Sequence, residues 1–236
     1  MSRLFEELSF RETRLGELSL RRRLCTLTHK DIYEVKLNDE FLMSSLFTHA
    51  EEELALLGLA AVKENELDVL VGGLGLGYTA AAALTDSRVR SLNVIETMSD
   101  VIDWHQQWLV PLGQQLSEDQ RCQFIEADFF TWARQEKSLT AELPGDLYHA
   151  ILLDIDHSTQ HWLNDDHAGF YSVEGLQKMQ SHLQPGGVFA MWSNDPPDDD
   201  FVMILKDVFC NVDAHIIRFP NPYQSRDATA TVYVAR

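Results

Sequence analysis

The sequence predicts an α/β protein built on a mostly parallel sheet, with a C-terminal antiparallel hairpin and a small N-terminal β unit. From residue 67 onward, short apolar runs alternate with segments of helical spacing, which is typical of a parallel sheet covered on both faces. A glycine-rich stretch joins the first of these runs to its helix. The last two apolar runs are separated by a turn-type loop alone, which favours an antiparallel pair.

The N-terminal segment predicts a small antiparallel β unit. The runs "FEELSFRET" and "GELSLRRRL" alternate on either side of a turn at Gly16, and "DIYEVKLND" follows with the same alternation. After Ser44 and Ser45 a linker leads into a helical pattern, with Glu51 to Glu53 near its first turn, where a helix dipole favours acids. We therefore expect a β unit over residues 1–43 and one larger domain over 44–236.

Five runs then predict the parallel strands, and each is followed by a helical segment: "DVLVGG", "SLNVIET", "CQFIEAD", "HAILLDID" and "GVFAMWSN". The runs "AHIIRFPN" and "ATATVYVAR" predict the closing hairpin, joined by the loop "NPYQSRD". Between the two groups, "DPPDDD" at 195–200 predicts a loop that caps the following helix.

Length and composition limit the classes of protein to consider. A chain of 236 residues with 45% hydrophobic residues can bury the core of one substantial domain. A net charge of −18 argues against a nucleic-acid partner, which needs a basic surface, and favours small or cationic ligands. No membrane-length apolar run and no signal-peptide pattern is seen, so we expect a cytoplasmic protein. Three scattered cysteines predict free thiols.

The glycine-rich stretch predicts a nucleoside-binding turn. The spacing of Gly73, Gly75 and Gly77 after a strand lets the backbone turn sharply, approach a ligand closely and open a helix. Glu96 ends the next strand about twenty residues on, where an acid binds ribose hydroxyls. Asp128 ends the third strand, where it can contact an adenine ring. The alternative reading is that these glycines only allow close packing of helix on strand.

Two ligand classes fit this unit. Residues 75–80 match G-x-G-x-x-A, a pattern typical of nicotinamide dinucleotide sites. However, no second half-fold or substrate domain follows, and the C-terminal hairpin is unlike a dinucleotide fold. The chain instead resembles the Rossmann-like fold of class I S-adenosylmethionine-dependent methyltransferases.

The resemblance is closer to one family. Seven segments carry this resemblance: the N-terminal β unit, "DEFLMSSLFTHAEEELALLGLA", Gly72–Gly73, "NVIET", "ADFF", "HAILLDID" and "LQPGGVFAMW". In their order and spacing they resemble the spermidine synthase (polyamine aminopropyltransferase) family over nearly the whole chain. The resemblance implies that the donor is S-adenosylmethionine or its decarboxylated form. It places the donor's amino-acid end at the glycines, its ribose at Glu96 and its adenine at Asp128, and it makes Asp154 the catalytic aspartate. A homodimer is also implied, by the resemblance alone.

Topology independently favours a site at Asp154. In a sheet whose order reverses beside its first strand, the first and fourth strands are neighbours, and ligands bind at their carboxyl ends. Asp154 follows the fourth run, so it should face the glycine loop. A carboxylate there can align an acceptor amine and take its proton. The alternative is that Asp154 is a helix cap.

The chain departs from the family at two places. Aminopropyltransferases have an aspartate within the glycine loop, where this chain has Leu74, Gly75 and Leu76. They also have a serine-rich acidic turn ending in proline after the catalytic aspartate, where this chain reads "IDHS" from residue 155. Asp156 can substitute for the second acid, with His157 beside it. Methyl transfer and aminopropyl transfer therefore both stay open.

Further polar and aromatic residues are candidates for the same site. The stretch "DIDHSTQHWLNDDH" predicts an acceptor lid, a metal site or a polar loop, and His157 and His161 are spaced as one helix face. No other metal motif supports it, so we expect no metal. Asn194 and Asp195 lie in "SNDPP", which favours a loop and helix start but can reach the acceptor. We expect Phe129 or Phe130 near the adenine and Tyr171 near the acceptor, although most such aromatics are core.

The sequence thus predicts a transferase that moves an alkyl group from an S-adenosylmethionine-type donor to a small, cationic or amine-bearing acceptor. The predicted catalytic residues are Asp154, Asp156 and His157. The predicted donor contacts are Gly72, Gly73, Gly75, Gly77, Glu96, Asp128 and Phe129, and the predicted acceptor contacts are Tyr171, Asn194 and Asp195. The alternatives are an NAD(P)-dependent oxidoreductase and a non-catalytic nucleoside-binding sensor. No nucleic-acid or membrane partner is expected.

Overall fold

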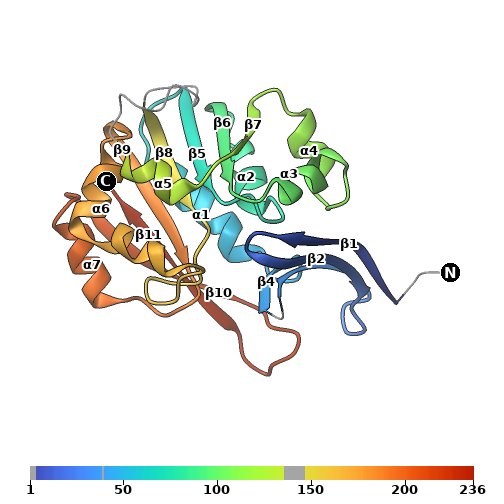
Figure 1. Ribbon diagram of the computed structural model, residues 1–236. Helices are drawn as coiled ribbons and strands as arrows, with labels where there is room; N and C mark the ends of the chain where they lie inside the picture. The colour runs from blue at the N-terminus through green and yellow to red at the C-terminus, as the bar shows by residue number, and fades with distance from the viewer. Residues whose placement is uncertain (1–3, 39, 136–146) are drawn as a thin grey trace.

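The computed structural model describes residues 4–38, 40–135 and 147–236. These residues form two sheets, a four-stranded one near the N-terminus and a seven-stranded one that carries the rest of the chain. Figure 1 shows the seven-stranded sheet between two groups of helices, with the N-terminal strands beside it.

The N-terminal sheet is an antiparallel meander of β1 (Phe5–Thr13), β2 (Gly16–Leu24), β3 (Asp31–Leu37) and β4 (Glu40–Ser44). One side of it is buried through Leu18, Leu20 and Val35, which belong to the main core of the protein. The first three strands confirm the alternating pattern of the sequence. The prediction of a linker before the first helix was incomplete, because residues 40–44 pair with β3 as a fourth strand. The Nζ of Lys36 lies 4.5 Å from the ring centroid of Phe41 across that pair.

The large sheet has the strand order β10-β11-β9-β8-β5-β6-β7. Its parallel strands are β5 (Leu67–Gly72), β6 (Val89–Glu96), β7 (Cys122–Glu126), β8 (Tyr148–Leu153) and β9 (Leu183–Ser193). The strands β10 (Val212–Phe219) and β11 (Ala228–Ala235) form the predicted antiparallel hairpin, and β11 also pairs antiparallel with β9. The first and fourth strands, β5 and β8, are neighbours as expected.

Helices cover both faces of the large sheet. The first group is α1 (His49–Ala60), α2 (Tyr78–Leu84), α3 (Ser99–Gln106) and α4 (Gly113–Glu118), and the second is α5 (Phe129–Arg134), α6 (Val173–Gln180) and α7 (Asp199–Lys206). A 3₁₀ helix, η1 (Asp165–Tyr171), precedes α6. The strand pattern explains the two layers, since Val69 and Val71 of β5 pack with the first group and Leu70 packs with the second.

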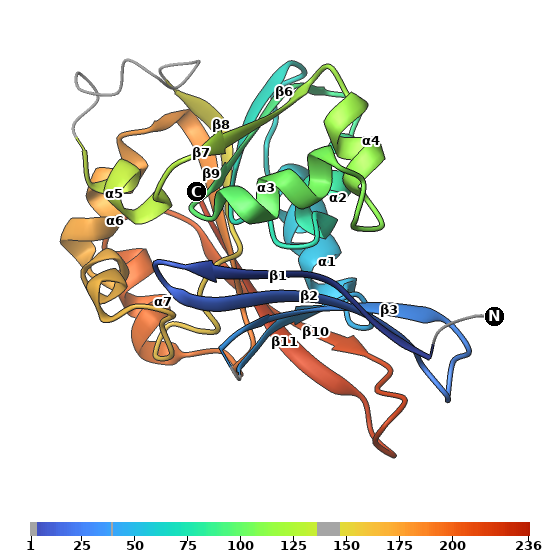
Figure 2. The same ribbon diagram turned by 45° about the vertical axis from the view of Figure 1, so that its right-hand side comes forward.

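The N-terminal sheet lies where it can cover the carboxyl ends of the parallel strands. Figure 2 shows β1 and β2 running past α3 and α1. Two close approaches show this position. The guanidinium of Arg14, in the turn between β1 and β2, donates to the Thr97 hydroxyl at 3.4 Å, and a Cβ placed on Gly75 would lie 2.7 Å from the sulfur of Met43. Within the described residues, no helix is both long and apolar enough to cross a membrane.

Candidate active site

The glycine loop starts where β5 ends and is held close to β8. The N–H of Asp154 donates to the carbonyl of Gly72 at 2.8 Å. Gly73 has φ +95°, and a Cβ at this position would lie 2.2 Å from the Asp154 carbonyl oxygen. Only glycine combines this backbone angle with this close approach. Gly77, with φ +91°, then caps α2. The loop therefore brings two strand ends together at one point, as the sequence predicts.

Glu96 ties the glycine loop to β6. Its carboxylate accepts hydrogen bonds from the N–H of Leu74 at 3.1 Å and the N–H of Met98 at 2.8 Å. Burial raises the pKa of Glu96, and these backbone hydrogen bonds act in the opposite direction. Because each carboxylate oxygen has two lone pairs, the group can still accept from ribose hydroxyls. Its ribose contact stays a prediction, while its hold on the loop is a direct observation.

Asp154 lies just past β8, against the first turn of α2. The Thr79 hydroxyl donates to its Oδ2 at 2.6 Å. Burial raises the pKa of Asp154 to about 6, and the hydrogen bond from Thr79 partly offsets the effect of burial. A carboxylate with this pKa is ionised at neutral pH and is a stronger base than an ordinary aspartate, which suits a group that accepts a proton. Among the residues predicted as catalytic, Asp154 is the one that accepts a hydrogen bond from α2 beside the glycine loop, and its catalytic role stays a prediction.

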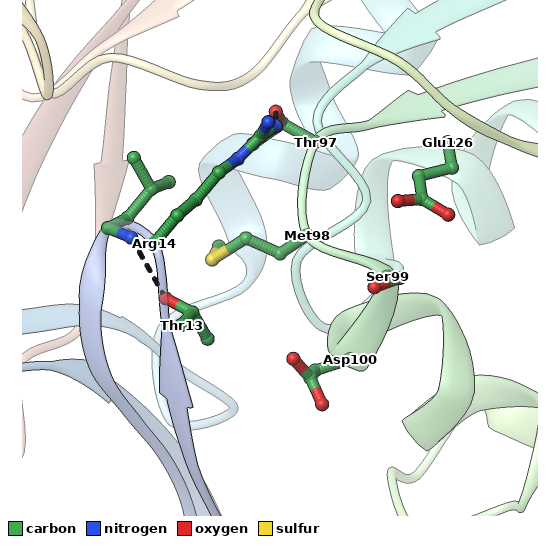
Figure 3. A pocket seen from close by; sticks show the side chains of 8 residues that line it. Thr13, Arg14, Thr97, Met98, Ser99, Asp100 and Glu126 are labelled. Carbon is green, nitrogen blue, oxygen red and sulfur yellow. Dashed lines mark hydrogen bonds between the residues drawn. The ribbon is translucent and has the colours of Figure 1, made fainter.

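A cavity of about 330 Å³ opens beside Glu96, at the carboxyl ends of β6 and β7. Figure 3 shows its lining, with Thr13 at the end of β1 and Arg14 in the β1–β2 turn facing Thr97 and Met98 after β6, and Glu126 at the end of β7. Ser99 and Asp100, at the start of α3, complete the wall. This is where a donor's nucleoside end would lie in a parallel sheet of this order.

Asp128 and Phe129 occupy positions that also serve the fold. The carboxylate of Asp128 accepts from the N–H of Thr131 and caps α5. Phe129 is buried, and its ring packs on Phe130, Trp132 and Phe170. It also fills the space beside the Cα of Gly72, since a Cβ there would lie 2.6 Å from the ring. Their contacts with an adenine stay predictions.

Asp156 and Tyr171, predicted as catalytic and acceptor residues, hydrogen-bond to each other. The Tyr171 hydroxyl donates to Asp156 Oδ2 at 2.7 Å, and the N–H of Leu163 donates to Oδ1 at 2.8 Å. His167 Nδ1 lies 2.8 Å from the same oxygen. Burial, followed by the charge of Asp156, raises the pKa of Tyr171 well above its usual value. This buried network fixes the segment behind Asp154, and a direct contact of these residues with substrate stays a prediction.

The structure brings His157, Asn194 and Asp195 together. The N–H of Asn194 donates to the carbonyl of His157 at 2.8 Å. Asp195 Oδ2 lies 3.1 Å from Nδ1 of His161. The sequence placed these residues on two separate loops, which the structure joins through this backbone hydrogen bond. Their contact with an acceptor stays a prediction. Among the described residues, no cluster of three or more His, Cys, Asp or Glu side chains is arranged to hold a metal ion.

Two side chains at this point of the fold were not predicted. Thr79 hydrogen-bonds to Asp154 and also lies 3.3 Å from the Glu51 carbonyl, so it links α2, β8 and α1. Burial and the nearby charge of Asp154 raise the pKa of Glu51 well above its usual value. The sequence shows Glu51 as one of three acids in a first helical turn, and nothing in that pattern marks the one that faces the site.

The chain has recognisable relatives among known proteins. No family model matches it. A polyamine aminopropyltransferase of Prochlorococcus marinus (strain MIT 9313) is 29% identical over 172 residues, which cover 68% of this chain and 54% of that relative. The match thus spans about half of the relative's length.

Solved structures resemble most of the chain. A spermidine synthase in complex with the transition state analogue AdoDATO has a TM-score of 0.73 at 17% identity, over 97% of this chain and 73% of its own. The spermidine synthase of Thermotoga maritima has a TM-score of 0.72 at 18% identity, over 97% of this chain and 72% of its own. Human methyltransferase-like protein 13, in complex with SAH, has a TM-score of 0.59 at 19% identity, over 79% of this chain and 82% of its own.

These similarities confirm the predicted fold class and the predicted resemblance to spermidine synthases. They give no support to the two alternative functions, an NAD(P)-dependent oxidoreductase and a non-catalytic nucleoside-binding sensor.

Proposed function

We propose that this chain is a transferase that moves an alkyl group, methyl or aminopropyl, from an S-adenosylmethionine-type donor to a small amine-bearing acceptor. The observation that carries the proposal is the position of Asp154. Its carboxylate lies at the junction of the glycine loop, α2 and β8, with a pKa raised to about 6. The similarity to a polyamine aminopropyltransferase supports the same reaction class.

The donor would lie along the carboxyl ends of β5, β6 and β7. We assign its amino-acid end to the glycine loop, where Gly73, Gly75 and Gly77 all have positive φ and leave room for close approach. Its ribose would meet Glu96, and its base the cavity between Arg14 and Glu126. Asp128 and Phe129 form the far side of this region in the proposal.

The proposed reaction is a displacement at the carbon attached to the sulfonium. The neutral amine uses its lone pair to form a C–N bond while the C–S bond breaks, and that electron pair stays on sulfur as a thioether. The amine nitrogen then carries one proton too many, and Asp154 accepts it. Alignment of nitrogen, carbon and sulfur is the main contribution required of the protein. The acceptor side, with His157, Asn194 and Asp195, would keep that alignment.

Both methyl and aminopropyl transfer are part of the proposal, because the glycine loop has Leu74, Gly75 and Leu76 where aminopropyltransferases have an acid. Calorimetric titration with S-adenosylmethionine, its decarboxylated form and methylthioadenosine distinguishes methyl transfer from aminopropyl transfer. Preference for the carboxylated donor assigns methyl transfer. Preference for the other two assigns aminopropyl transfer. Mass spectrometry of products from an amine panel then tests turnover. Binding of none of the three would refute the proposal.

Three further assignments belong to the same proposal. We expect a cationic acceptor, a homodimer and a cytoplasmic location. Size-exclusion chromatography with light scattering tests the oligomeric state.

A further inference from the structure

A second pocket lies on the acceptor side of Asp154. It measures about 230 Å³ and lies between the start of α1, the ends of β9 and β10, and the start of β11. Phe47 and Phe219 form an aromatic wall, with ring centroids 6.0 Å apart. Among the described residues that line it, Glu51 is the one ionisable side chain. The pocket can therefore distinguish ligands by where they carry charge.

Glu51 marks the end of this pocket that is nearest to Asp154. The Thr79 hydroxyl contacts both the backbone carbonyl of Glu51 and the carboxylate of Asp154, at 3.3 Å and 2.6 Å. The two carboxylates are close enough for the charge of Asp154 to raise the pKa of Glu51. An amine bound at Glu51 would therefore also be attracted by the charge of Asp154.

The carboxylate of Glu51 has no cation beside it within the described part of the chain. Its Oε2 is buried and has no hydrogen-bond partner there. Other acids of this protein are paired, since Asp86 and Asp119 each accept from an arginine at 2.7 Å. A buried carboxylate without a partner is unfavourable, and an ammonium group would supply both the missing charge and the missing donor.

The rest of the pocket is uncharged and offers a hydrogen-bond donor. The indole Nε1 of Trp192 is buried and has no partner among the described residues. Asn194, Asn221 and Thr229 are the other polar lining residues, and all three are neutral. An indole N–H can only donate, so it complements a carbonyl or hydroxyl oxygen and repels an ammonium group. A second ammonium group on the acceptor would have no carboxylate to pair with among the other described lining residues.

We propose that this pocket binds the acceptor of the transfer reaction, and that this acceptor has a single amine nitrogen and an uncharged tail with a hydrogen-bond acceptor for Trp192. The nitrogen binds to Glu51 as an ammonium group and becomes the neutral nucleophile by giving one proton to the Glu51 carboxylate; the second proton, released after the C–N bond forms, goes to Asp154. The inference rests on the proposed function and narrows its substrate class. An N-acylated diamine has this chemistry, whereas a bare diamine carries a second charge into the neutral end. Glu51 thereby supplies from α1 a carboxylate that the glycine loop lacks.

Calorimetry tests the inference without turnover. The protein is saturated with the donor product that it binds, methylthioadenosine or S-adenosylhomocysteine, and titrated with putrescine, N-acetylputrescine and an n-alkylamine of the same length as N-acetylputrescine. We expect N-acetylputrescine to bind at least about tenfold more tightly than putrescine. Glu51→Gln should weaken the binding of N-acetylputrescine and of the alkylamine about tenfold or more. Glu53→Gln, on the same helix but outside the pocket, is the matched control and should leave the affinities for both amines unchanged. Trp192→Phe should weaken the binding of N-acetylputrescine alone, and should lower its affinity to that of the alkylamine.

The outcomes separate the inference from the function. Putrescine binding as tightly as N-acetylputrescine overturns the inference, and so does unchanged amine affinity in Glu51→Gln. If putrescine is also alkylated by the wild-type protein, the proposed function still stands. If the donor product binds and none of the three amines does, both the inference and the proposed amine acceptor are refuted. The comparison of putrescine with N-acetylputrescine uses the wild-type protein, so it holds even if a variant fails to fold.

Discussion

Replacing Gly73 by alanine tests whether the close approach of the glycine loop to β8 builds the site. Gly73 has φ +95°, and a Cβ would lie 2.2 Å from the Asp154 carbonyl oxygen and 3.0 Å from Cγ1 of Ile155. The first of these neighbours is backbone, so it can only yield if β8 or the loop moves. Such a movement would displace the Asp154 carboxylate relative to α2.

Gly186 provides the matched control. It also has positive φ, +81°, yet nothing lies within 4 Å of a Cβ placed there. Alanine at Gly186 should therefore lower the free energy of unfolding only by the cost of the backbone angle, about 1–2 kcal/mol. Alanine at Gly73 adds overlap with a packed backbone, which brings the expected loss to about 2–5 kcal/mol.

Urea unfolding and donor calorimetry measure the two effects. We expect Gly186→Ala to keep wild-type donor affinity, and Gly73→Ala to weaken donor binding at least about tenfold as well as to unfold at lower urea. Equal losses of stability in the two variants would show that the backbone angle alone matters. Unchanged donor affinity in a folded Gly73→Ala protein would refute the assignment of this loop to the donor.

Three further predictions concern Asp154 and Glu96. Asp154→Asn should abolish turnover and keep donor affinity. Because burial raises the pKa of Asp154 to about 6, ionisation costs stability as pH rises from about 4 to 6. The variant should therefore be more stable than wild type by about 3 kcal/mol at pH 8 and equal to it below pH 4. Unfolding curves at both pH values would contradict this if the variant were less stable at pH 8. For the wild type, kcat/KM should fall about tenfold per pH unit below pH 6, since the protonated carboxyl cannot accept a proton; a flat profile from pH 5 to 7 would remove Asp154 as the base. Glu96→Gln should weaken donor binding about tenfold, because an amide supplies one acceptor oxygen where the N–H groups of Leu74 and Met98 need two; calorimetry with unchanged affinity would limit Glu96 to a structural role.

Most of the fold could be predicted because its main features have local causes in the sequence. Alternating apolar runs and helices imply a parallel sheet, and the two closing runs with a short loop imply a hairpin. The glycine loop was predictable because few structures need positive φ at three alternate positions. The strand at residues 40–44 was missed, since it is only five residues long and forms by pairing with β3. A short run of this kind has no pattern that separates it from a linker.

The donor side of the site was easier to predict than the acceptor side. Glu96 and Asp154 end strands of one sheet, so topology alone brings them to the glycine loop. The lining of the donor cavity also includes Arg14, which arrives from a separate sheet about eighty residues away from Thr97 in the sequence. No spacing rule connects two such segments. Residues contributed by the covering sheet are therefore visible only once the chain is folded.

Glu51 shows why the acceptor side escaped prediction. In the sequence it is one of three acids at the start of α1, and an acid in a first helical turn already has an explanation in the helix dipole. In the structure that explanation is insufficient for Glu51, because burial and the charge of Asp154 both raise the pKa of its carboxyl and so disfavour its charged form. A polar group kept at such a cost is expected at functional sites. A cation that enters beside Glu51 and Asp154 would relieve the repulsion between the two acids, so the same pair that destabilises the free protein would favour an ammonium-bearing ligand.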